Sequence, residues 1–182
     1  MKRRFALVKR GKYSLAERLS ESIHLEAEED GGVRKTVDCN APKKTVSNKL
    51  LRFECIFSCF DSADEDCFSG KLFEMSARLE NQSVECRFEC RDRQSLLQKR
   101  SFSADAAFML ELHEITVSQG IAAHNGYYCR VSGLPDMYGA SIFAEYDSGE
   151  TVNAFDNQDN FLSKNAQTAL VMLFDKYYNK QR

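Results

Sequence analysis

The chain has 182 residues, of which 43% are hydrophobic and 29% charged, and a formal net charge of −2, a composition typical of globular domains and not of disordered chains. The only apolar run near the amino terminus covers Phe5 to Val8, whereas a signal peptide needs about 7–15 apolar residues and a membrane helix roughly 20. We therefore expect residues 1–182 to form a single cytoplasmic domain without a membrane contact, and the odd number of seven cysteines indicates free thiols.

Residues 14–38 carry two overlapping patterns. Residues 14–17 form a capping box, and Leu15, Leu19 and Ile23 follow at helical spacing. From Ile23 onward the apolar residues alternate instead, as in a strand. Residues 14–30 thus fit either element, and we favour a short helix from 14 to about 21 followed by a hairpin that turns at the glycines 31 and 32.

Strand patterns dominate the next segment. Apolar and polar residues alternate over 51–59, 73–79 and 84–90. The last two runs flank Asn81 and Gln82, so we expect an antiparallel hairpin that turns there, with one apolar and one charged face. The polar residues 39–49 and 60–70 are typical of loops.

The second half of the chain predicts two helices and three strands. A helix starts at about 104 with Ser103 as its N-cap and ends before Gly120, and its narrow polar wedge indicates that it is mostly buried. Short strands follow at 127–132, 139–146 and 150–156, the last two joined by a tight turn at 147–149. A final helix covers about 163–178.

These elements predict an α+β fold. We expect an antiparallel sheet of meanders or hairpins, whose twist allows it to curl strongly, with two principal helices covering its apolar face.

The motifs that could carry metal or catalytic chemistry are incomplete. The pairs Cys55/Cys59 and Cys86/Cys90 lie four residues apart, which is about 13 Å along a strand, so neither pair can chelate one zinc ion. All four cysteines lie on the apolar phase of their strands, and we expect them to be reduced and buried. His113 and Glu114 begin an H-E-x-x-H motif, but Val117 replaces the second histidine.

Two further patterns fail in the same way. The segment from Asp156 resembles the start of a calcium loop, but Phe161 stands where the loop requires glycine and Gln167 where it requires glutamate. The sequence also contains neither a phosphate-binding glycine loop nor the G-x-S-x-G elbow of hydrolases. We therefore predict no cofactor, no metal ligand and no catalytic residue.

One segment is a candidate binding surface. Between Asp136 and Asn160 the chain combines strand-end loops with tyrosine, carboxylate and amide side chains. We expect five residues to lie on one accessible surface and to contact a partner or a small cationic ligand, namely Tyr138, Asp156, Asn157, Asp159 and Asn160. The alternative is that the residues around Asp156 only cap the last helix and that Tyr138 lies in the core.

The sequence favours a non-catalytic binding or protein-interaction domain whose partner is a protein or a small ligand. An enzyme on an unfamiliar scaffold is one alternative. Another is an inhibitor- or immunity-type protein with an acidic partner-binding face, because the stretch between Arg130 and Lys164 contains six acids and no Lys or Arg. The basic residues within 1–13 could contact phosphates, but the acidic net charge and the missing recognition motifs argue against nucleic acid.

Overall fold

The computed structural model of the chain describes residues 23–28, 32–59, 68–92, 95–133 and 138–181. The predicted helix at 14–21 and most of the predicted loop at 60–70 lie outside these residues. The described elements are, in chain order, β1 (Ile23–Glu28), β2 (Val33–Asp38), β3 (Leu50–Ser58), β4 (Leu72–Glu80), β5 (Ser83–Arg91), β6 (Leu96–Ala104), α2 (Ala107–Ser118), the short 3₁₀ helix η1 (Ile121–His124), β7 (Tyr127–Val131), β8 (Ala140–Tyr146), β9 (Thr151–Asp156) and α3 (Lys164–Asn179).

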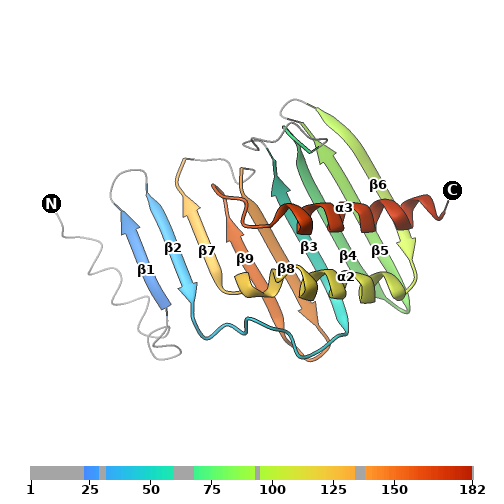
Figure 1. The fold of residues 1–182 in the computed structure, drawn as a ribbon, viewed down its shortest axis with the longest axis horizontal. Helices are drawn as coiled ribbons and strands as arrows, with labels where there is room; N and C mark the ends of the chain where they lie inside the picture. Colours follow the sequence, from blue (N-terminus) through green and yellow to red (C-terminus); the bar gives the residue numbers. More distant parts are fainter. Residues whose placement is uncertain (1–22, 29–31, 60–67, 93–94, 134–137, 182) are drawn as a thin grey trace.

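The described strands form one nine-stranded sheet in the order β1-β2-β7-β9-β8-β3-β4-β5-β6, so the fold is α+β (Figure 1). Neighbouring strands are antiparallel except β7 and β9, which are parallel. The expectation of a purely antiparallel sheet is therefore wrong. The reason is that the β8–β9 hairpin places β9, and not β8, beside β7, while β8 pairs with β3.

The predicted hairpins are confirmed. β4 and β5 pair antiparallel around Asn81 and Gln82, whose φ angles of 47° and 77° suit a tight two-residue turn. β1 and β2 form the hairpin expected at the glycines, and β8 and β9 pair around the turn at 147–149. The charged residues of β4 and β5 lie on the sheet face opposite the core, as predicted.

The start of the first predicted helix is wrong. Residues 96–104 form the edge strand β6, so Ser103 is a strand residue, and α2 begins after Ala106 without a side-chain cap. The sequence pattern does not reveal β6 because an edge strand needs little apolar surface. Phe102 is the residue of β6 that is buried. The expectation that this helix is mostly buried also fails, since Leu110 is 52% and Val117 55% exposed.

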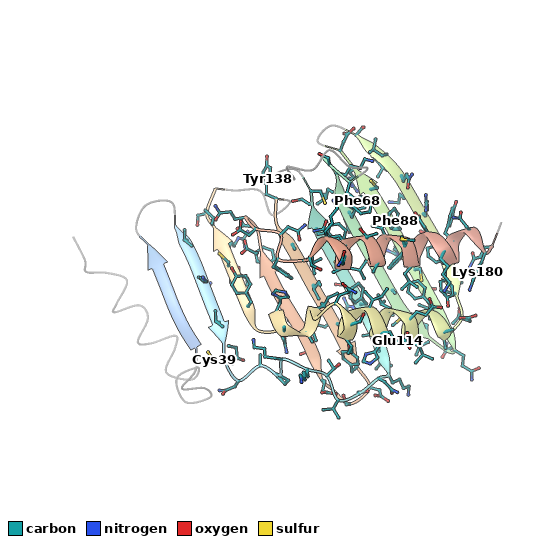
Figure 2. The ribbon with its side chains drawn as sticks, in the orientation of Figure 1. Cys39, Phe68, Phe88, Glu114, Tyr138 and Lys180 are labelled. Carbon is teal, nitrogen blue, oxygen red and sulfur yellow. The ribbon has the colours of Figure 1, made fainter. Side chains whose placement is uncertain are left out.

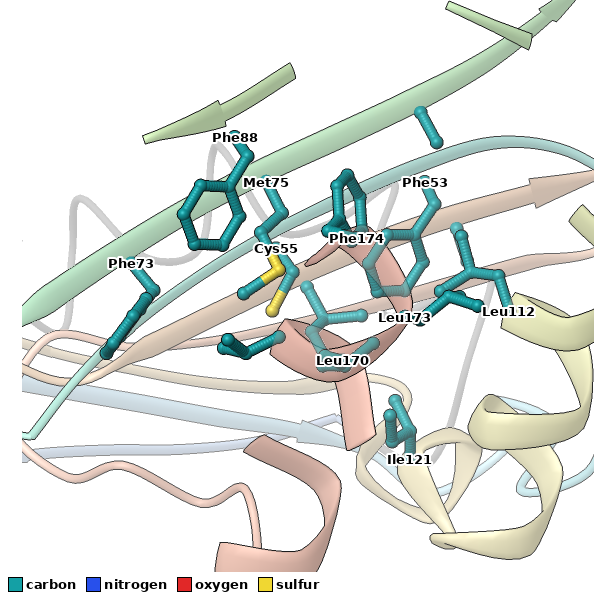
Figure 3. Close-up of a cluster of buried hydrophobic side chains, with 14 of the residues drawn as sticks. Phe53, Cys55, Phe73, Met75, Phe88, Leu112, Ile121, Leu170, Leu173 and Phe174 are labelled. Atoms are coloured by element: carbon teal, nitrogen blue, oxygen red, sulfur yellow. The ribbon is translucent and has the colours of Figure 1, made fainter. Parts of the chain in front are cut away.

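α2 and α3 run side by side across one face of the sheet (Figure 1). α3 starts at Ser163, whose hydroxyl accepts a hydrogen bond from the Ala166 N–H at 3.2 Å, as expected for an N-cap. Figure 3 shows Leu170 and Phe174 of α3 in one cluster with Phe53 and Met75 of the sheet. The core thus lies between the helix layer and strands β3, β4, β5 and β8.

The cysteines on the apolar strand phases are part of this core. Cys55, Cys59, Cys86 and Cys90 are buried and form no disulfide, as predicted. Burial raises the pKa of Cys86 to about 12 and the pKa of Cys55 further still. None of the described helices has the length and apolar character that crossing a membrane requires.

Candidate functional site

The end of β9 is organised by the Asp156 carboxylate. Its side chain is 1% exposed and accepts three hydrogen bonds, from the Tyr127 hydroxyl at 2.8 Å, the Gln158 N–H at 2.8 Å and the Asp159 N–H at 2.9 Å. Two of these donors belong to the loop that follows β9. Asp156 therefore fixes the direction in which the chain leaves the sheet, and burial together with this carboxylate raises the pKa of Tyr127.

Asn157 continues the pairing between β7 and β9 with its side chain. Its Oδ1 accepts from the Val131 N–H at 2.8 Å and its Nδ2 donates to the Val131 carbonyl at 3.0 Å, while the residue is fully buried. The expectation that Asp156 and Asn157 are accessible is thus wrong for both side chains. Their polar atoms stabilise the junction of two parallel strands, which local sequence patterns do not reveal.

The backbone at Gly139 packs closely against the backbone at Asp156, which brings the segments that carry the predicted site residues together. A Cβ on Gly139 would lie 1.9 Å from the Asp156 carbonyl oxygen, so only glycine fits there. The Gly139 carbonyl also accepts from the Ser58 N–H at 3.0 Å, and the Ser58 hydroxyl donates to the Tyr138 carbonyl. Tyr138 is half-buried and lies at the end of the sheet between β7 and β8 (Figure 2).

A depression of about 260 Å³ lies at this junction, and we call it the β9–α3 depression. It is lined by Ser58, Cys59, Tyr138, Gln158, Asp159, Asn160, Lys164 and Gln167. Three of the five predicted residues, Tyr138, Asp159 and Asn160, therefore share one site. Asn160 is held in place because its Nδ2 donates to the Ser58 carbonyl at 2.7 Å and its Oδ1 accepts from the Leu162 N–H at 3.1 Å.

The sequence did not predict the other five lining residues, namely Ser58, Cys59, Gln158, Lys164 and Gln167. Gln167 is 7% exposed, its Nε2 donates to the Leu162 carbonyl at 2.8 Å, and its Oε1 accepts from the Cys59 thiol at 3.2 Å. Lys164 lies in the first turn of α3, with its Nζ 5.2 Å from the centre of the Phe68 ring. One signal was available in the sequence, because Gln167 is an amide on the otherwise apolar face of α3.

The thiol in the depression is poorly suited to nucleophilic attack. Burial raises the pKa of Cys59, an effect that nearby Lys164 only partly offsets, so Cys59 is a thiol at neutral pH and a weak nucleophile. Among the described lining residues there is no histidine to serve as a base. The described residues also contain no cluster of three or more His, Cys, Asp or Glu arranged to hold a metal ion.

The acids of the base-free stretch do not form one face. Asp156 is buried, and Glu145 pairs across the sheet with Arg52. Asp147 accepts a hydrogen bond from the Ser47 hydroxyl at 2.8 Å and forms an ion pair with Lys49 at 3.3 Å, and both contacts lower the pKa of its carboxyl. Glu150 accepts from the Ser148 hydroxyl at 2.7 Å and from the backbone N–H groups of residues 46 and 47, and these hydrogen bonds lower the pKa of its carboxyl. Asp136 lies outside the described residues. Asp147, Glu150 and Asp156 thus make contacts within the fold.

Comparison with protein-family models, with curated proteins and with solved structures finds no match to this chain.

Proposed function

We propose that this protein is a non-catalytic binding domain that holds a small polar ligand in the β9–α3 depression. The observation that carries this proposal is the lining of that depression, where the Asp159 carboxylate and the Lys164 ammonium flank amide and phenol groups. A carboxylate accepts hydrogen bonds and an ammonium donates them, so the pair suits a ligand that carries both a cationic and an anionic group.

The size of the depression limits the ligand. Its volume of about 260 Å³ is below the roughly 300–1,000 Å³ of pockets that take drug-sized molecules. A zwitterion of amino-acid size fits this space better than a cofactor or a peptide. This refines the small cationic ligand expected from the sequence, because Lys164 adds a positive group to the site.

Two further features support the wider proposal. The described buried residues form one continuous core cluster, which supports a single domain. The buried free thiols fit a reducing compartment, which supports the cytoplasm. The acidic-face alternative loses support because Asp147 and Glu150 are engaged in contacts within the fold and Asp156 is buried.

A thermal-shift screen with the common amino acids and small betaines tests the proposal. A ligand at about 100 times its Kd stabilises by about 2.7 kcal/mol, which for a chain of this size raises Tm by about 5–11 °C. Binding to Asp159→Asn and Lys164→Met should be about 10- to 150-fold weaker in calorimetry, the loss expected for one charge-assisted hydrogen bond.

The matched controls are Asp147→Asn and Lys49→Met, which remove an exposed ion pair away from the depression. Both controls should bind as the wild type does. The proposal is wrong if no compound of the panel raises Tm, or if the Asp159 and Lys164 variants retain wild-type affinity.

A further inference from the structure

The sheet face opposite α2 and α3 carries a row of aromatic side chains. Tyr128 of β7 and Phe155 of β9 are cross-strand partners, and their rings stack with centroids 5.2 Å apart and planes inclined by 25°. Both are partly exposed, whereas the neighbours of Phe155 in the strand, Ala154 and Asp156, are buried on the core side. Phe143, on the adjacent strand β8, is also partly exposed on the helix-free face.

Arginines flank these rings. Arg34 of β2 and Arg130 of β7 are directly opposite each other and exposed, and the Arg34 guanidinium lies 6.0 Å from the centre of the Tyr128 ring. Like charges in directly opposed positions destabilise a sheet, and a bound anion would offset that cost. At the other end of the row, the Arg52 guanidinium lies 5.3 Å from the Phe143 ring but is neutralised by Glu54 at 2.6 Å.

The same part of the molecule has room for a ligand. A hollow of about 530 Å³ adjoins the row, and its lining includes Tyr128, Thr151 and Asn153 together with the carboxylates of Asp38 and Glu150. Ser141, the cross-strand partner of Phe155 on its other side, is small and leaves space beside that ring.

We propose that the helix-free face of β2, β7 and β9 binds single-stranded nucleic acid, with bases stacked on the Tyr128–Phe155 row and phosphates contacted by Arg34 and Arg130. Base stacking on aromatic rings next to cationic side chains is how sequence-tolerant single-strand binders work, and it needs no reading helix. This site is separate from the β9–α3 depression. It differs from the expectation, made from net charge and missing motifs, that nucleic acid is an unlikely partner.

Fluorescence anisotropy with labelled (dT)₁₂ and (U)₁₂ tests the proposal, with a blunt 12-base-pair duplex as comparison. The wild type should bind the single strands and bind the duplex more weakly. Phe155→Leu, which keeps an apolar side chain but removes the ring, should weaken binding by about 5- to 150-fold. A thermal melt of this variant checks that the loss does not come from unfolding.

The arginine pair gives a second test on exposed side chains. Arg34→Gln combined with Arg130→Gln should reduce the slope of log K against log salt by about 1.4, since each phosphate contact on a single strand contributes about 0.7. Arg78→Gln is the matched control, because Arg78 lies on the same face in β4 and pairs with Glu80 at 3.3 Å.

Three outcomes would overturn the proposal. One is a wild-type protein that binds neither single strand, or binds the duplex as tightly. Another is an Arg78 variant that loses as much affinity as the Arg34/Arg130 variant. The third is competition by polyglutamate at the same charge concentration as effective as that by (dT)₁₂, which would mean that an acidic protein segment is the partner.

Discussion

Removing the Asp156 carboxylate should destabilise the fold, although the sequence alone suggests that it would impair only binding. In Asp156→Ala, three donors lose their acceptor, one hydroxyl and two backbone N–H groups. A hydrogen bond to a charged group contributes about 1.5–3 kcal/mol. Gln158 and Asp159 are exposed, so water can reach their N–H groups and offset part of the remaining loss.

The expected cost of Asp156→Ala is therefore about 2–4 kcal/mol of unfolding free energy. Asp156→Asn is the matched variant, because Oδ1 can still accept from the two N–H groups while the amide nitrogen donates to the Tyr127 hydroxyl. It should cost about 1 kcal/mol, the net value of a single neutral hydrogen bond.

Urea denaturation at constant m-value measures both variants. A double-mutant cycle with Tyr127→Phe should give a coupling energy of about 1.5–3 kcal/mol, because it isolates the charged hydrogen bond of 2.8 Å. If Asp156→Ala unfolds within about 0.5 kcal/mol of the wild type, the range of an ordinary surface substitution, then Asp156 does not organise the junction. Because Asp156→Ala is expected to destabilise the fold, ligand-binding tests should use Asp159 variants and not Asp156 variants.

Two further measurements test the core and the helix layer. Phe88 is 2% exposed and its ring lies 6.2 Å from those of Phe73 and Phe174, so Phe88→Ala should cost about 3–5 kcal/mol in denaturant melts; a loss below about 1 kcal/mol contradicts its place in the core. A hydrogen bond from Lys176 and a second one from Tyr177 lower the pKa of Glu111 below its usual 4.5. This stabilisation is present above about pH 4.5 and is lost as the pH falls through the folded-state pKa of Glu111. Glu111→Gln should therefore be less stable than the wild type at pH 7 and equally stable at low pH. A difference in unfolding free energy that stays constant across the pH range would refute this.

The sequence by itself determined the elements whose pattern is local. Alternation in 73–79 and 84–90, with two residues between them, predicts both the β4–β5 hairpin and the burial of its cysteines, because side chains on a strand point to opposite faces in turn. The apolar residues at helical spacing within 163–178 predict α3 and the face that it buries.

Tertiary structure decided whatever depends on which strands become neighbours. β6 carries little apolar surface because it is an edge, and residue alternation cannot show which strand will be an edge. The sequence predicted Asp156 and Asn157 to be accessible because their hydrogen-bond partners are distant in the chain. These partners, Tyr127 and Val131, lie in β7, which pairs in parallel with β9. No local pattern encodes that strand order.

The two proposed sites have the same origin. Cys59 and Gln167 are more than 100 positions apart in the chain, and they meet in the β9–α3 depression because α3 starts over the end of β3. Tyr128 and Phe155 stack because β9 lies beside β7, which aligns two aromatic residues from separate strands on one face. Hydrophobic periodicity determines which face of each element is apolar, whereas contacts between elements distant in sequence exist only once the strand order is set.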